Sequence, residues 1–450
     1  MTMRHIQRRR RSGYILVQTL VVIMALVALM AIMAADQHSS MVETDNGLDE
    51  RRAEMAVDAA VARAEASLGA ANPNLVTASD TWTQVGQNGI SPTASTGVQP
   101  AEYQLYDESM PSDSAPTFRM QILDAASLIN LNEPAILATS GISAGTQTTM
   151  LTGIQQQWLD LGLTQQQIDC LLDWEQTGET ARSDGAKDSF YNGLQQPYNA
   201  TLGAMSTVDE SLLVDNWTGQ TLYQAQQSSS TSTPLPTDSL GNTLPIASLV
   251  TVDSGAPNTQ ASGTARIRIT SNRVAQQLGL PIPRNGNSPA VNATSFTQLF
   301  GQGGMNPQAE QNVLNQVTFT TSTRLAGKIN LNTAPQAVLQ TVPGVTQAIA
   351  SAIVAQQSAG FQTFGQLATV NGITPGVLAQ CADYFSVGSD TWIVRAYGHS
   401  GNTGVAVEAV IRVTNSAPQI ITWDRINTTT VPTWWDWQDA TATVDASQTN

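Results

Sequence analysis

The chain has 450 residues, enough for two or three domains, and only 12% of them are charged. Its formal net charge is −15, although the first eleven residues hold five arginines, Arg4 and the four at positions 8–11. Without those five charges, the rest of the chain carries about −20. So acidic a body repels phosphate backbones, which argues against nucleic acid as a partner of the folded part.

The N-terminus has the pattern of a membrane anchor. A basic stretch at residues 4–13 precedes an apolar run at residues 14–35, where strong hydrogen-bonding groups occur only on Tyr14, Gln18 and Thr19. About 20 apolar helical residues cross the hydrocarbon core of a bilayer, and the basic end stays in the cytoplasm. We therefore expect a single-pass protein of the cell inner membrane whose globular head lies in the periplasm.

Three interpretations fit this N-terminus: a cleaved secretory signal peptide, an ordinary signal anchor, and a prepilin leader. The apolar run is long for a signal peptide and ends in a weak cleavage site. Gly13 separates the basic stretch from the apolar run, which resembles the prepilin signal. That resemblance implies cleavage between Gly13 and Tyr14 and N-methylation of Tyr14.

Gln18 would be the fifth residue of the mature chain, a position that is usually Glu in pilins. A buried carboxylate in an apolar helix bundle is costly unless it is paired, and in pilins it pairs with the N-terminal amine of a neighbouring subunit. The lack of a glutamate at this position resembles the K-type minor pseudopilins. That resemblance implies a subunit at the filament tip. Drift of the superfamily signal is the alternative explanation.

Downstream elements follow from the spacing of apolar residues. The helix continues past the membrane until Asn72 and Pro73 end it. Alternating residues predict strands at 102–106 and 117–124, and helical spacing predicts helices within 133–175. Residues 226–316 are rich in Ser, Thr, Pro and Gly and predict a partly ordered surface insertion, with one strand at 264–270. Beyond it, the pattern predicts a strand, helical hairpins within 334–385, and a β-hairpin of residues 392–397 and 405–413.

Together these elements predict an α+β fold. It has a long N-terminal hydrophobic helix as a pilin-like spine, an antiparallel sheet head with an inserted helical domain, and a helix-hairpin-helix-like C-terminal segment. The expected parts are the leader (1–13), the spine helix (14–70), the start of the head (71–126), the helical domain (127–225), the low-complexity insertion (226–316), the C-terminal α/β part (317–425) and a Trp-rich tail (426–450).

The tetrapeptide Ile-Asn-Leu-Asn occurs twice, at residues 129–132 and 329–332, each time shortly before a proline. We expect Asn132 and Asn332 to cap the first turn of the helix that follows. Two independent strand-to-helix caps would account for the repeat.

A longer series of motifs resembles the general secretion pathway protein K family, the K-type minor pseudopilins of type II secretion. The matching residues are INLN at 129–132, Asp173-Trp174, Gly185-Ala186, Tyr191, Pro197-Tyr198, Asp209-Glu210, INLNTA at 329–334, VPGV at 342–345 and Tyr384-Phe385. Their order and spacing agree over most of residues 1–225 and 317–425. Two departures are Lys187, where the family has a glutamate after Gly-Ala, and the insertion at 226–316.

Acidic residues gather between the two halves of the helical domain. Asp173, Glu175, Asp184 and Asp188 could supply the several oxygens that a structural calcium ion needs. A solvated acidic loop is the alternative interpretation. No other cofactor is expected.

Cysteines and tryptophans leave two further alternatives. Cys170 and Cys381 form a disulfide in an oxidising compartment, or they are buried free thiols. Trp434, Trp435 and Trp437 form a partner surface, or they fold back onto the sheet.

The resemblance implies a function in assembly. No paired carboxylates, nucleophile motif or cofactor loop points to an enzyme. We expect a non-enzymatic minor pseudopilin at the pseudopilus tip that supports protein export across the outer membrane. Its expected partners are other minor pseudopilins, with the secretin or exported proteins as further candidates. The alternatives are a minor pilin of a type IV pilus and a helix-hairpin-helix protein for DNA binding or uptake, although residues 333–385 contain no Lys or Arg to bind phosphate.

Overall fold

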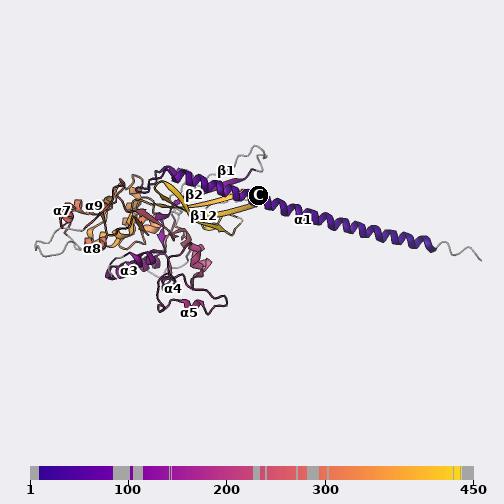
Figure 1. Ribbon diagram of the computed structural model, residues 1–450, viewed down its shortest axis with the longest axis horizontal. Helices are drawn as coiled ribbons and strands as arrows, with labels where there is room; N and C mark the ends of the chain where they lie inside the picture. Colours follow the sequence, from indigo (N-terminus) through magenta and orange to yellow (C-terminus); the bar gives the residue numbers. More distant parts are fainter. Residues whose placement is uncertain are drawn as a thin grey trace, which may run out of the picture.

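The computed structural model describes residues 10–84, 102–104, 115–140, 142, 144–226, 234–238, 241–269, 272–280, 293–301, 304–428, 430–435 and 437. Most of the expected leader, residues 1–9, lies outside this part. The first element, α1 (Arg10–Leu68), is one helix of 59 residues, and its N-terminal half projects from the head as a long rod (Figure 1). The predicted continuous spine helix is confirmed.

The C-terminal half of α1 packs on a sheet because small and apolar residues recur on one of its faces. Its buried residues are Ala53, Ala56, Val57, Ala60, Val61, Ala64 and Leu68, which follow helical spacing. The alanines let the helix backbone approach the sheet closely. Gly398 completes this fit, because a Cβ at that position would collide with the carbonyl oxygen of Ala53.

The central sheet has five antiparallel strands in the order β1-β2-β11-β12-β13. They are β1 (Glu102–Gln104), β2 (Thr117–Asp124), β11 (Thr391–Ser400), β12 (Thr403–Thr414) and β13 (Ala417–Ile426). The last strand was not predicted. Although β2 and β11 are neighbours, residues 125–390 separate them in the chain. Everything between them is therefore one long insertion into a small sheet.

The first part of this insertion is helical, as predicted. Its elements are the 3-10 helix η3 (Ala125–Ser127), α2 (Glu133–Thr139), α3 (Ala144–Asp160), α4 (Gln165–Glu175), α5 (Asp188–Tyr191), η4 (Val208–Leu213) and α6 (Gly219–Tyr223). Thr164 begins α4 with a capping box, because its side chain accepts from the Gln167 amide while Gln167 reaches back. Trp158 and Trp174 are buried in the core between these helices.

The expected surface insertion at 226–316 is instead, in its described parts, interleaved with this core. It contains η5 (Ile246–Ser248), β4 (Val250–Thr251), β5 (Gly255–Pro257), β6 (Ile267–Arg268), α7 (Asn272–Gln277), α8 (Phe296–Gly301) and α9 (Pro307–Gln316). Leu249, Phe296 and Val313 are buried in the same cluster as Trp158. Scattered apolar residues suffice here because distant elements supply the rest of each apolar surface.

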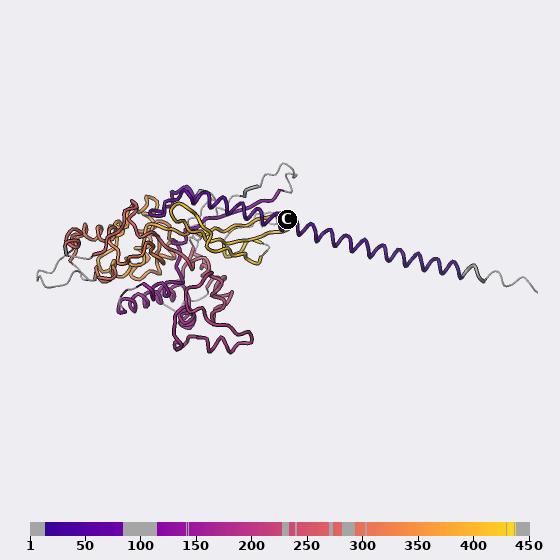
Figure 2. Tube along the Cα trace, in the orientation of Figure 1, coloured from indigo at the N-terminus to yellow at the C-terminus, as the bar shows by residue number. Residues whose placement is uncertain are grey.

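The second part of the insertion returns the chain to the sheet. It consists of β7 (Val317–Thr318), β8 (Arg324–Ala326), β9 (Ile329–Asn330), α10 (Gln336–Leu339), α11 (Gln347–Gln357), η6 (Phe364–Thr369), α12 (Pro375–Cys381), η7 (Ala382–Tyr384) and β10 (Phe385–Ser386). Short strand pairs join distant segments: β3 (Ile129–Asn130) with β4, β9 with β10, β5 with β8, and β6 with β7. Figure 2 shows the chain passing from the magenta helical part through the orange segments to the yellow strands of the sheet.

Candidate functional site

The N-terminal half of α1 is the first candidate surface. Every large apolar side chain between Tyr14 and Met33 is more than half exposed, and this stretch is long and apolar enough to cross a membrane. Gln18 lies within it, while Gly13 and Tyr14 lie near its N-terminal end. Apolar surface of this extent requires lipid or other apolar helices around it. Cleavage after Gly13 and methylation of Tyr14 remain predictions.

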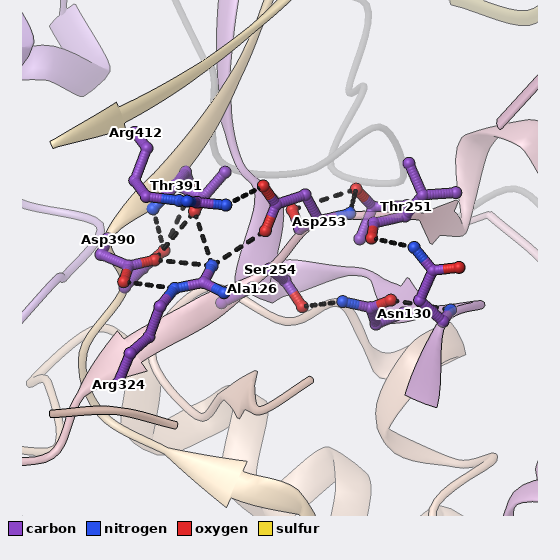
Figure 3. Close-up of polar contacts among 12 residues, drawn as sticks. Ala126, Asn130, Thr251, Asp253, Ser254, Arg324, Asp390, Thr391 and Arg412 are labelled. Carbon is purple, nitrogen blue, oxygen red and sulfur yellow. Dashed lines mark hydrogen bonds and ion pairs between the residues drawn. The ribbon is translucent and has the colours of Figure 1, made fainter. Parts of the chain in front are cut away.

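An ionic network joins the insertion to the sheet (Figure 3). Arg324 of β8 donates from Nε to Asp390 Oδ2 at 2.7 Å and from Nη2 to Asp253 Oδ1 at 2.9 Å. Arg412 of β12 pairs with the other oxygen of Asp253. Burial acts to lower the pKa of Arg324, but the charges of Asp390 and Asp253 outweigh it and raise that pKa.

This network holds β5 and β8 against the sheet with its charges balanced. Gly255 of β5 makes room for it, because a Cβ there would lie 2.6 Å from Arg324 Cζ. Asp253 and Asp390 are 137 positions apart in the sequence. Residue patterns along the chain contain no signal for contacts over such separations, so the network was not predicted.

The two Ile-Asn-Leu-Asn segments do not work as expected. Asn132 makes no side-chain cap to α2, and the residue that caps α10 is Pro335 rather than Asn332. Instead, each second asparagine holds a distant backbone. Asn132 accepts from the Met205 amide at 2.7 Å and donates to a carbonyl, and Asn332 accepts from the Phe361 amide at 2.6 Å and donates to the Phe361 carbonyl.

The first asparagine of the second copy reaches the sheet. Asn330 Nδ2 donates to Asp124 Oδ2 at 2.8 Å, and the Thr333 hydroxyl donates to the same oxygen at 2.6 Å. Burial raises the pKa of Asp124, although these bonds oppose the rise. Through these hydrogen bonds, the Asp124 carboxylate at the end of β2 connects the sheet to the segment that precedes the C-terminal helical hairpins.

The expected calcium ligands are already occupied or lie apart. Asp173 Oδ1 pairs with Arg182 Nη1 at 2.6 Å, and the ammonium of Lys187 donates to the carbonyl oxygens of Asp173 and Gln176 at 2.6 and 2.5 Å. Lys187 is the residue that departs from the family's glutamate, and burial lowers its pKa although Asp173 raises it. Its ammonium thus lies among the oxygens that a cation would need.

The other three carboxylates do not complete a site. Glu175 is buried, which raises the pKa of its carboxyl, Asp188 accepts from the Ala200 amide, and Asp184 is exposed. Within the described ranges, no group of three or more acidic, His or Cys side chains is placed to hold a metal ion. The calcium expectation is therefore not supported by this arrangement.

Of the two interpretations of the cysteines, the structure has the free thiols rather than the disulfide. Cys170 and Cys381 are both buried free thiols. The Cys170 thiol donates to the Asp184 carbonyl at 3.3 Å. Burial raises the pKa of Cys170 to about 11 and that of Cys381 to about 12, so both stay protonated at neutral pH.

The tail tryptophans fold back onto the sheet. Trp435 and Trp437 are buried with Ala406 of β12, on the face opposite to α1. The guanidinium carbon of Arg395 lies 4.5 Å from the centre of the Trp434 ring, a cation–π geometry. Of the two interpretations, the structure has the folded-back one, and these rings cover the second face of the sheet.

The fold defines a class: an α+β protein in which a long apolar helix packs on an antiparallel sheet and a large helical insertion separates two neighbouring strands. Residues 128–227 match the family model described as type II secretion system protein K. Over these residues, the chain is similar to the type II secretion system protein K family. Residues 326–386 match the helix-hairpin-helix motif.

Solved structures give a further comparison. A chain of the crystal structure of the GspK–GspI–GspJ complex from the enterotoxigenic Escherichia coli type 2 secretion system aligns with a TM-score of 0.44 at 13% identity. The alignment covers 87% of this chain and 100% of that chain. No curated protein matches the sequence.

Proposed function

We propose that this chain is a minor pseudopilin of the type II secretion system, a non-enzymatic subunit at the tip of the pseudopilus. The observation that carries the proposal is the combination of an exposed apolar helix with a very bulky head. The 266 residues between β2 and β11 enlarge a five-stranded sheet that would otherwise be pilin-sized. A head of this size does not fit between stacked small subunits, whereas the end of a filament has room for it.

The proposed anchor follows from the same helix. Its apolar half would lie in the inner membrane, with the head in the periplasm, until the helix packs beside those of other minor pseudopilins. The match to the protein K family model supports this choice of partners, since the GspK of enterotoxigenic E. coli was crystallised with GspI and GspJ. Support for protein export across the outer membrane then follows from nucleating the filament.

The helix-hairpin-helix match makes DNA binding the second candidate. In such modules the hairpin amides bind phosphate and basic side chains surround them. Here a groove of about 940 Å³ lies along the hairpin, and none of the described residues that line it is Lys or Arg. The nearest cations in sequence are committed elsewhere, since Arg324 pairs with Asp390 and Lys328 donates to the Asp383 carbonyl. We therefore infer that the motif has a structural role in this chain.

The test is the mature N-terminus. Mass spectrometry of the chain from cells with an active prepilin peptidase should find a methylated Tyr14 as the first residue. The chain from cells without the peptidase should keep its leader, as should a Gly13→Val variant in normal cells. An intact leader in the normal strain would refute the proposal. Gene neighbours encoding a secretion ATPase and a secretin, rather than twitching-pilus proteins, distinguish it from the type IV pilus alternative.

A further inference from the structure

The outer edge of β13 is unusual for a soluble surface. In the part of the chain that the structure describes, this ten-residue strand pairs only with β12, so its outer backbone groups face away from the sheet. Ile420, Ile421 and Trp423 are each more than two-fifths exposed. Proteins normally keep edge strands short or charged, because a long apolar edge pairs readily with another strand.

The charged residues of β13 lie too far from its centre to prevent another strand from pairing there. Residues 419–423 read Gln-Ile-Ile-Thr-Trp, without a charge, and the strand's charged pair lies at one end. Of that pair, Arg425 is already held by Glu50 and Glu54 of α1. A bulge leaves Ile421 without an opposite residue in β12, and its side chain is exposed.

The strand runs alongside α1, in the opposite direction. Arg425, near the end of β13, reaches Glu50 and Glu54, whereas Pro418, near its start, lies beside Gly69. Trp423 is opposite Ala409, which is in the core that α1 covers, so Trp423 lies on the α1 side of the sheet. The apolar edge is therefore next to the helix that continues into the membrane.

This geometry decides between occupants of the edge. Two copies of this chain would pair edge to edge about a twofold axis perpendicular to β13, since symmetric strand pairing is antiparallel. Because β13 runs along α1, that axis would also invert the second α1. Two helices anchored in one membrane with the same orientation cannot be related in this way. The occupant is thus a strand from a different chain.

We propose that the outer edge of β13, with Ile420, Ile421 and Trp423, docks an extended strand of another pilin-type subunit whose own membrane helix lies beside α1. The inference rests on the proposed function and adds the surface by which the head meets its neighbour. Backbone pairing along the uncharged centre of β13 would supply affinity, and the exposed side chains of Ile421 and Trp423 would pack against apolar side chains of the added strand.

The experiment uses the full-length chain expressed with the other pseudopilins of its system and purified in mild detergent. Ile421→Glu puts a charge on the edge, and Ile267→Glu of β6 is the matched control, because Ile267 has the same exposure. We expect Ile421→Glu to lower the amount of co-purified pseudopilins about tenfold or more, and Ile267→Glu to leave it unchanged. An unchanged thermal unfolding curve shows that both variants are folded.

The outcomes separate the two proposals. If the unsubstituted chain recovers pseudopilins and Ile421→Glu recovers them equally, the docking surface is wrong and the proposed function survives. If the unsubstituted chain recovers none, the proposed function fails and the docking surface fails with it. A photo-crosslinking residue in place of Trp423 adds an identity test. A link to another pilin-type subunit supports the proposal, whereas a link to a second copy or within the chain overturns it.

Discussion

Glu133 is a buried carboxyl whose titration tests the packing of the insertion. It begins α2, it is 8% exposed, and burial raises its pKa from 4.5 to about 7, against the opposing charge of Lys328. The pKa of the folded state is above that of the unfolded chain, so folding takes up a proton between these values. The stabilisation by this proton is fully present below pH 4.5 and is lost as the pH rises through about 7.

The size of the effect follows from the two pKa values. A change from 4.5 to about 7 corresponds to roughly 3 kcal/mol, at about 1.4 kcal/mol for each tenfold change in proton affinity. Glu133→Gln keeps the shape of the side chain and removes the charge. We therefore expect the variant to be more stable than the unsubstituted protein by roughly 3 kcal/mol at about pH 8, and equally stable at about pH 4.

The measurement is denaturant unfolding of the full-length chain in detergent, followed by the fluorescence of the buried tryptophans at several pH values between about 4 and 8. Glu179→Gln is the control, because Glu179 is exposed. It should leave the pH profile of the unfolding free energy unchanged. If Glu133→Gln gives the same profile as the unsubstituted protein, the carboxyl is not buried as described and the reasoning is refuted.

Two further substitutions test the polar joints. Gly255→Ala places a Cβ 2.6 Å from Arg324 Cζ and should lower the unfolding free energy by about 1–3 kcal/mol. The control is Gly145→Ala in α3, which has open space around it and should not lower the unfolding free energy. Equal effects of the two substitutions would contradict the described network. Lys187→Met removes the ammonium that two carbonyl oxygens share and should destabilise the chain by about 1–3 kcal/mol without creating calcium-dependent stability. Stabilisation of this variant by added calcium would show that the oxygens can still hold a metal ion.

The long helix and the hairpin of the sheet could be predicted because their signals are local. A run of apolar residues across a bilayer's thickness, and alternation on either side of a turn, are complete within each segment. The strand β2 and the helices α3 and α4 were predicted for the same reason. The last strand of the sheet, β13, was not predicted because its apolar residues are exposed and do not alternate with buried ones.

The joints between segments could not be predicted in this way. Asn132 and Asn332 have the residue type of a helix cap, yet each holds a backbone segment far away in the sequence. Asp173 has the residue type of a calcium ligand, yet Arg182 and the nearby Lys187 neutralise it. A side chain's chemistry limits what it can bind, but which partner reaches it depends on the fold.

The sequence by itself determined the long apolar helix, the acidic composition and the recurring motifs, since composition and spacing carry them. Only the tertiary structure decided that the described parts of residues 244–316 share the core and that the tail tryptophans pack on the sheet. It also decided that, among the described residues, β13 pairs with β12 alone. The physical reason is that burial is a property of two surfaces that meet. The sequence of a segment specifies its own apolar surface, whereas the topology of the chain decides which other segment packs against that surface.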